Sequence, residues 1–202
     1  MAAAAYTWVL KDGLGQIGGI LFAARYGSNF DEDIKKWRFM SIFSLNIAVL
    51  IEIMTLKYPH LFLFLASTAN VGKNICYLLA SASRSSINMR FAKRNNMGDI
   101  SGKSVSQWTT SSLIGMGFGM GLSSVINISS IPQLLPTCLS LSVFSLYFTY
   151  KSAVIIDEVY FNNPRANLFF SHYFDSGDKK EILSVEQVNA MESFLFPNAL
   201  NK

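Results

Sequence analysis

Residues 39–56 read FMSIFSLNIAVLIEIMTL, a mostly apolar stretch whose length is close to the roughly 20 residues that a helix needs to cross hydrocarbon. Four further stretches of similar character flank it. Together the five are Ala2–Ala24, Phe39–Leu56, Leu61–Ala82, Leu113–Ile131 and Leu134–Ile156. The sequence therefore predicts an all-α fold, an integral membrane helical bundle of about five spans.

Basic residues are divided unevenly between the segments that join these stretches. If the chain threads the stretches in order, fourteen of the 17 Lys and Arg fall on one side. They are Arg25, Lys35, Lys36, Arg38, Arg84, Arg90, Lys93, Arg94, Lys103, Lys151, Arg165, Lys179, Lys180 and Lys202. The opposite side has only Lys57, and Lys11 and Lys73 lie inside stretches. Because basic segments stay on the non-translocated side, we expect the N-terminus outside and the C-terminus inside.

The chain is expected to have two parts. Residues 1–156 form the transmembrane bundle, with a basic inner loop at 84–107, and residues 157–202 form a small polar C-terminal tail. Ser184-Val185-Glu186-Gln187 has the capping-box pattern that opens a helix, and Pro197 would end it. The tail is therefore expected to contain a short helix.

The composition suits a membrane protein better than a nucleic-acid-binding one. Half of the residues are apolar, 15% are charged, and the mean hydropathy is +0.30. The sequence pI is near 9.1, but the basic residues flank apolar stretches instead of alternating with aromatics on one surface. We therefore expect anionic lipids as partners, and no nucleic acid.

The first stretch carries polar and small residues on one helical face. Asp12, Gly15, Gln16 and Gly19 share this face, and Gly15 with Gly19 forms a GxxxG pair that permits close approach of another helix. A charge at bilayer depth costs at least ~2.5–3.5 kcal/mol, so Asp12 should face protein or the interface. The alternatives are a packing helix with a satisfied polar pair, a substrate or ion site, and an interfacial helix that does not span.

Lys73 lies near the centre of the third stretch, and Glu52 lies about a turn from one end of the second. Three roles are possible for the Lys73 side chain. It pairs with Glu52 in the bundle, it extends its stem to the surface, or it takes part in transport or a proton relay.

The fourth stretch begins with Gly115-Met116-Gly117-Phe118-Gly119-Met120-Gly121. These glycines superficially resemble a nucleotide-binding loop, but no strand precedes them and no Lys-Ser/Thr or ribose-binding acid follows. They form two overlapping GxxxG pairs, of which we single out Gly115 and Gly119. The spacing predicts close packing against a neighbouring helix.

The segment 84–107 offers a candidate docking or lipid headgroup site. Arg90, Lys93 and Arg94 form a basic cluster that would attract phosphate. Asp99, Lys103, Ser106 and Gln107 then recur on one helical face, and Asp99 precedes Lys103 in the favourable acid-before-base order. A solvated face is the alternative.

No catalytic constellation occurs in the sequence. The only histidines are His60 and His172, neither HExxH nor GxSxG is present, and no His and Cys have metal-ligand spacing. We therefore expect no enzyme activity, no metal and no cofactor.

Three segments are distinctive as a set: Lys11-Asp12-Gly13-Leu14-Gly15-Gln16-Ile17-Gly18-Gly19, Phe30-Asp31 with Lys35 and Arg38, and Asn96-x-x-Asp99-x-x-x-Lys103-x-x-Ser106-Gln107 continuing into Leu113-Ile114-Gly115. Weaker echoes are Tyr150-Lys151, Asn162-x-x-Arg165 and Val185-Glu186-Gln187-Val188-Asn189 followed by Glu192. In this order they resemble the root UVB sensitive family of eukaryotic membrane proteins.

The resemblance implies a plastid, mitochondrial or endoplasmic reticulum membrane and a link to vitamin B6 homeostasis and early seedling development in plants. It supplies no established catalytic residue or transported substrate. Family members usually extend further at both ends, so the chain reads as a shortened member.

The leading hypothesis is a non-enzymatic membrane protein that acts as a structural or accessory subunit, or scaffold, in an organelle membrane complex. Its partners would be other membrane protein subunits, and the inner mitochondrial membrane is the leading location. The alternative is a small-molecule or ion carrier that uses Asp12, Gln16, Asn70 and Lys73. A third hypothesis is a lipid-binding protein that uses residues 90–103.

Overall fold

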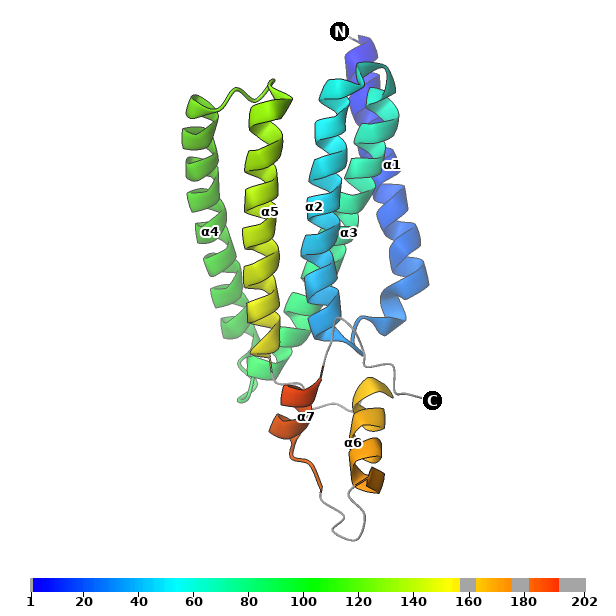
Figure 1. The fold of residues 1–202 in the computed structure, drawn as a ribbon, viewed down its shortest axis with the longest axis vertical. Coiled ribbons are helices and arrows are strands. Elements are labelled where there is room, and N and C mark those ends of the chain that lie inside the picture. Colours follow the sequence, from blue (N-terminus) through cyan, green and yellow to red (C-terminus); the bar gives the residue numbers. More distant parts are fainter. Residues whose placement is uncertain (1, 157–162, 176–181, 193–202) are drawn as a thin grey trace.

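The computed structural model describes residues 2–156, 163–175 and 182–192, and the regular structure of these residues is entirely helical (Figure 1). Five long helices stand side by side, and two short helices lie beyond one end of them. The long helices are α1 (Ala2–Tyr26), α2 (Ile34–Lys57), α3 (Phe62–Phe91), α4 (Met97–Val125) and α5 (Ile131–Val154). The short helices are α6 (Asn163–Asp175) and α7 (Val185–Met191). The all-α prediction is confirmed.

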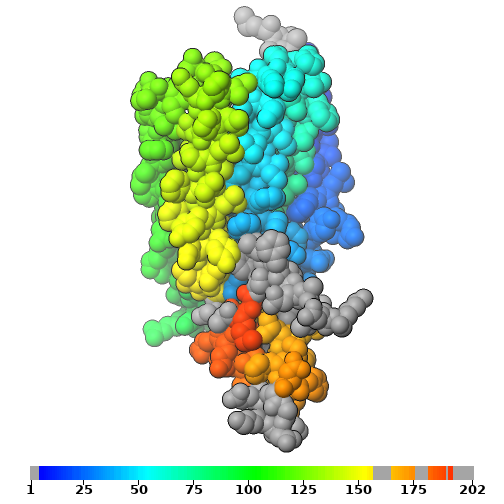
Figure 2. Space-filling view, viewed as in Figure 1, coloured from blue at the N-terminus to red at the C-terminus, as the bar shows by residue number. Residues whose placement is uncertain are grey.

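The pair α2 and α3 forms the centre of the bundle. α1 packs along α3, α5 packs along α2, and α4 makes its main contact with α3. Figure 1 shows α4 at the edge of the bundle, opposite α1. The space-filling view shows α6 and α7 at the end where α3 passes into α4 (Figure 2). The basic segments predicted on one side meet at this end, which we call the basic end of the bundle.

Short connections set the antiparallel order. Single turns of 3-10 helix follow α1 and α2, at Gly27–Asn29 and Pro59–Leu61. Pro59 also ends α2, because a residue that precedes proline is disfavoured in the helical conformation. Asn95 has a φ of 53°, a left-handed conformation that asparagine tolerates, in the turn before α4. α5 starts with Pro132 in its first turn, where a missing N–H costs little.

The centre of the bundle is packed with small residues. Ala48 and Ala69 are about 1% exposed, and Ser41 is fully buried. Small side chains let helices approach closely, as they do in membrane bundles. Many large apolar side chains point outward, although Leu79 is buried in the centre. Phe118, Phe144 and Phe148, for example, are each more than 60% exposed.

The five-span prediction is only partly supported. Two of the described helices, α2 and α5, are long and apolar enough to cross a membrane, with peak mean hydropathies of 2.0 and 1.4. The other three long helices are diluted by polar residues. α1 carries Lys11 and Asp12, α3 carries Lys73, and α4 opens on a polar segment. The described residues thus form an all-helical fold with two candidate membrane spans.

The prediction of an inner loop at 84–107 needs correction, because most of this segment is helical. α3 continues to Phe91 and α4 begins at Met97, so the connection is only 92–96. The helical spacing of Asp99 and Lys103 belongs to the first turns of α4.

The tail contains two helices, α6 and α7, where the sequence predicted one. The capping box at Ser184 is confirmed, since its hydroxyl accepts from the Gln187 amide and the Gln187 side chain accepts from the Ser184 amide. Helix α6 was not predicted, although it carries the aromatic pairs Phe169-Phe170 and Tyr173-Phe174. Pro164 in its first turn is a helix-start signal that could have located it. Pro197 lies outside the described residues.

Candidate functional site

The expected glycine packing is found between α1 and α3. A Cβ added to Gly15 would lie 2.8 Å from Cβ of Asn70, and one added to Gly19 would lie 3.1 Å from Cβ of Asn74. Gly18, between them, would place a Cβ 2.6 Å from a methyl group of Val71. The stripe of glycines on α1 therefore permits a backbone approach that any larger residue would prevent.

Asp12 is held at the same interface by two polar side chains, those of Lys11 and Asn70. Its Oδ1 lies 3.1 Å from Nζ of Lys11 and accepts a hydrogen bond of 2.7 Å from Nδ2 of Asn70. The Lys11 ammonium also stands 4.3 Å from the centre of the Trp8 ring. The arrangement corresponds to a packing helix with a satisfied polar pair, one of the alternatives left open by the sequence.

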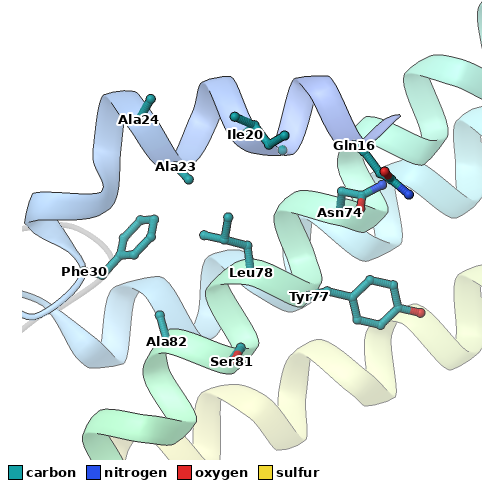
Figure 3. Close-up of a pocket in the computed structure, with 11 residues that line it drawn as sticks. Gln16, Ile20, Ala23, Ala24, Phe30, Asn74, Tyr77, Leu78, Ser81 and Ala82 are labelled. Atoms are coloured by element: carbon teal, nitrogen blue, oxygen red, sulfur yellow. The ribbon is translucent and has the colours of Figure 1, made fainter. Parts of the chain in front are cut away.

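A groove of about 990 Å³ runs between α1 and α3 (Figure 3). Gln16 and Asn74 lie near one another at one end of it, and Ile20, Phe30 and Leu78 give it an apolar wall. Apolar walls with a few polar groups are typical of small-molecule sites. Asp12 and Lys73 are not among the residues that line this groove.

Lys73 pairs with Glu52, the first of its three possible roles. Nζ of Lys73 lies 2.6 Å from Oε2 of Glu52, which connects α3 to α2. Two further polar contacts join α2 to α3 and to α5. Ser44 donates to the carbonyl of Gly72 at 2.8 Å, and Asn46 donates to Oγ of Ser145 at 3.1 Å. Several polar residues inside the stretches thus connect neighbouring helices, while many Ser and Thr hydroxyls donate to carbonyls of their own helix.

The glycines of α4 do not pack within the chain, contrary to the simplest form of the prediction. No neighbouring side chain or other helix of the described chain lies within 4 Å of a Cβ added to Gly115 or Gly119. The same holds for Gly117 and Gly121, and no residue of α4 is buried. The reason is geometric, because α4 contacts α3 mainly near the basic end and stands apart from the bundle along the rest of its length (Figure 1).

The predicted docking cluster is divided between two places. Arg90, Lys93 and Gln107 line a cleft of about 1040 Å³ at the basic end. Asp99 and Lys103 form an exposed ion pair of 2.8 Å beside a smaller hollow of about 460 Å³, which Gln107 also lines. Arg94 is exposed and lines neither hollow.

Sequence reasoning missed a buried polar cluster that joins the tail to the bundle. Arg165 of α6 and Lys35 of α2 are each only 3% exposed, and both reach Glu192, just after α7. Asn189 accepts hydrogen bonds from both cations. We call these four residues the tail cluster. The signal was present, since Lys35 and the three tail residues all belong to the segments that resemble the family.

Converging metal ligands are not found in the described part of the chain, where no group of three His, Cys, Asp or Glu side chains could hold an ion. The polar residues there make ion pairs and interhelical hydrogen bonds. These contacts hold the helices together. The α1–α3 groove and the cleft at the basic end are large enough to accommodate a small molecule.

Comparison with known proteins adds a family. The family model described as the vitamin B6 photo-protection and homoeostasis domain matches residues 1–177. Protein root UVB sensitive 3 of Arabidopsis thaliana is 30% identical over 192 residues, which are 95% of this chain and 43% of the relative. RUS family member 1 of Dictyostelium discoideum is 32% identical over 200 residues, 97% of this chain and 37% of the relative.

A second plant relative is similar to the same extent. Protein root UVB sensitive 6 of Arabidopsis thaliana is 33% identical over 197 residues, 97% of this chain and 38% of the relative. The chain therefore spans about two fifths of the length of these curated relatives. No solved structure matches it.

Proposed function

The chain belongs to the root UVB sensitive family, and we propose that it is a non-enzymatic membrane subunit that serves vitamin B6 homeostasis by assembling with other membrane proteins. The proposed location is an organelle membrane, with the inner mitochondrial membrane first and a plastid or the endoplasmic reticulum as alternatives. Anionic lipids are the proposed partners at the basic end.

The distribution of side chains supports a membrane setting for the five long helices. Small residues fill the centre, whereas large apolar residues face outward along α1, α4 and α5. A soluble protein rarely exposes apolar patches of such extent. The basic end would lie at the non-translocated surface, beside anionic headgroups.

The observation that carries the subunit proposal is the open face of α4. Gly115 and Gly119 lie on one face, one helical turn apart, and meet no other helix of the described chain. Lipid does not require glycine at its boundary, but the close approach of a second helix does. We therefore propose that a transmembrane helix of another subunit packs against Gly115 and Gly119.

The test is the size of the native particle. The tagged full chain is extracted from its own membrane in mild detergent, and the protein mass of the particle is measured by light scattering. We expect a mass far above that of the 22.5 kDa chain, and a fall toward one chain in Gly119→Leu. Met120→Leu, a volume-conserving change on the same helix, should leave the particle intact.

A carrier is the second candidate, and the α1–α3 groove is the observation that favours it. The groove is large enough for a small molecule and brings Gln16 and Asn74 together beside an apolar wall. Asp12 and Lys73, the charged residues of the carrier hypothesis, are engaged with Lys11, Asn70 and Glu52 instead. Substrate-dependent uptake by the isolated chain would promote this candidate over the subunit.

A further inference from the structure

The cleft at the basic end brings together four cations from separate places in the sequence. Arg38 comes from α2, Arg84 and Arg90 come from α3, and Lys93 comes from the connection to α4. The three arginines are half-buried, and Lys93 is exposed. Among the residues that the structure describes, none that lines the cleft is acidic.

Three of these cations have no carboxylate partner within the described residues. The ion pairs there do not include Arg38, Arg84 or Lys93. The nearby acid on α4, Asp99, is engaged with Lys103 and does not line the cleft. Because like charges repel one another across a partly desolvated space, an anion in the cleft would be stabilised by all of them.

The rest of the lining indicates what kind of anion fits. Ser104 and Gln107 offer a hydroxyl and an amide donor beside the cations. Trp108 and Ile155 form an apolar wall, and the Arg84 guanidinium stands 5.5 Å from the centre of the Trp108 ring. A planar guanidinium matches the oxygens of a phosphate group and keeps its charge at any physiological pH.

We propose that this cleft binds a phosphate ester whose phosphate group faces Arg38, Arg84 and Lys93 and whose apolar part lies against Trp108 and Ile155. Two sources share this chemistry: the headgroup of an anionic phospholipid and a soluble organic phosphate. The volume of about 1040 Å³ accommodates either one. The proposal rests on and refines the proposed contact of the basic end with anionic partners, and it does not depend on the subunit function.

The test uses the full chain purified in a non-ionic detergent and titrated calorimetrically with four probes. Dioctanoyl phosphatidic acid and dioctanoyl phosphatidylcholine represent the lipid source, and phenyl phosphate and inorganic phosphate represent the soluble source. We expect saturable binding of phosphatidic acid, phenyl phosphate or both, with phosphatidylcholine much weaker. Phosphatidic acid alone identifies a lipid headgroup site, and phenyl phosphate alone identifies a soluble ester site.

Variants connect the binding to the cleft. Arg38→Gln with Arg84→Gln should weaken the bound probe at least about tenfold, because charge-assisted hydrogen bonds are lost. Arg94→Gln removes one charge from the same region but outside the cleft, and should change affinity less than about twofold. Lys93→Gln, at an exposed position, should weaken binding severalfold and serves if the double variant does not fold.

Two results would overturn the proposal. The first is that the wild-type chain shows saturable binding of neither phosphatidic acid nor phenyl phosphate. The second is equal weakening by Lys93→Gln and Arg94→Gln, which would indicate a diffuse attraction to the basic end and no site in the cleft.

Discussion

The guanidinium of Arg165 and the carboxylate of Glu192 form a two-pronged ion pair that is almost completely buried. Nε lies 3.0 Å from Oε1 and Nη2 lies 2.6 Å from Oε2, and the side chains are 3% and 5% exposed. Lys35 at the start of α2 lies 3.6 Å from the same carboxylate. The tail is therefore joined to the basic end of the bundle by buried charges.

Removing the carboxylate should release the tail. Glu192→Gln removes the anion that two buried cations share, so we expect a loss of about 3–5 kcal/mol in the docking of α6 and α7. Limited proteolysis should then cut the tail while the bundle stays protected. Asp99→Asn is the control, because its exposed pair with Lys103 contributes only about 0.5 kcal/mol. Equal protease resistance of Glu192→Gln and the wild type would contradict the prediction.

The glycines of α1 differ in how much space surrounds them. Gly15→Ala places a methyl group 2.8 Å from Cβ of Asn70, so it should destabilise the bundle by about 1–3 kcal/mol through overpacking. Gly13→Ala meets no atom within 4 Å and should stabilise the helix by up to about 1 kcal/mol. Thermal unfolding in detergent distinguishes them. Equal melting temperatures for the two variants would mean that α1 does not pack on α3 as described.

Topology is tested by cysteine labelling in sealed organelles. With Cys76→Ala and Cys138→Ser as background, Ser28→Cys and Gly98→Cys should react with an impermeant reagent from one side and Ser129→Cys from the other. The first two positions lie at the basic end, and Ser129 lies in the turn between α4 and α5 at the opposite end. Labelling of all three from one side would mean that the bundle does not span.

The carrier hypothesis predicts a different response from the polar residues of α1. If Asp12 only holds α1 against α3, Asp12→Asn should loosen that contact, because Asn70 loses a charged acceptor. The substitution should have no effect on transport. The purified chain in liposomes should then take up no labelled B6 vitamer above protein-free liposomes. Uptake that is abolished in Asp12→Asn while the native particle keeps its mass would replace the subunit proposal with a carrier.

The helices were predictable because their signals are local. Apolar length located the stretches around Phe39–Leu56 and Leu61–Ala82, and the glycine stripe on α1 identified its packing face. The capping box at Ser184 located α7. Each of these signals lies within a few turns of the chain, where periodicity and capping rules apply directly.

What could not be predicted depends on distant contacts. Lys35 and Glu192 are far apart in the sequence, and no local pattern indicates that the tail folds back to bury them together. The cleft likewise needs Arg38 of α2 beside Arg84 of α3, a pairing that follows from helix packing. The open face of α4 was unpredictable for the same reason, since GxxxG spacing indicates that a helix can be approached closely but not which helix approaches it.

The most direct test of the subunit proposal is photo-crosslinking from α4 in intact organelle membranes. Benzoylphenylalanine replaces Phe118, which flanks the face of Gly115 and Gly119, or replaces Leu113 on the far side of the helix as the control. We predict a discrete protein adduct from position 118 that is absent from position 113 and disappears when Gly119→Leu is added. Adducts to lipid alone from position 118 would contradict the proposal that α4 packs against another subunit.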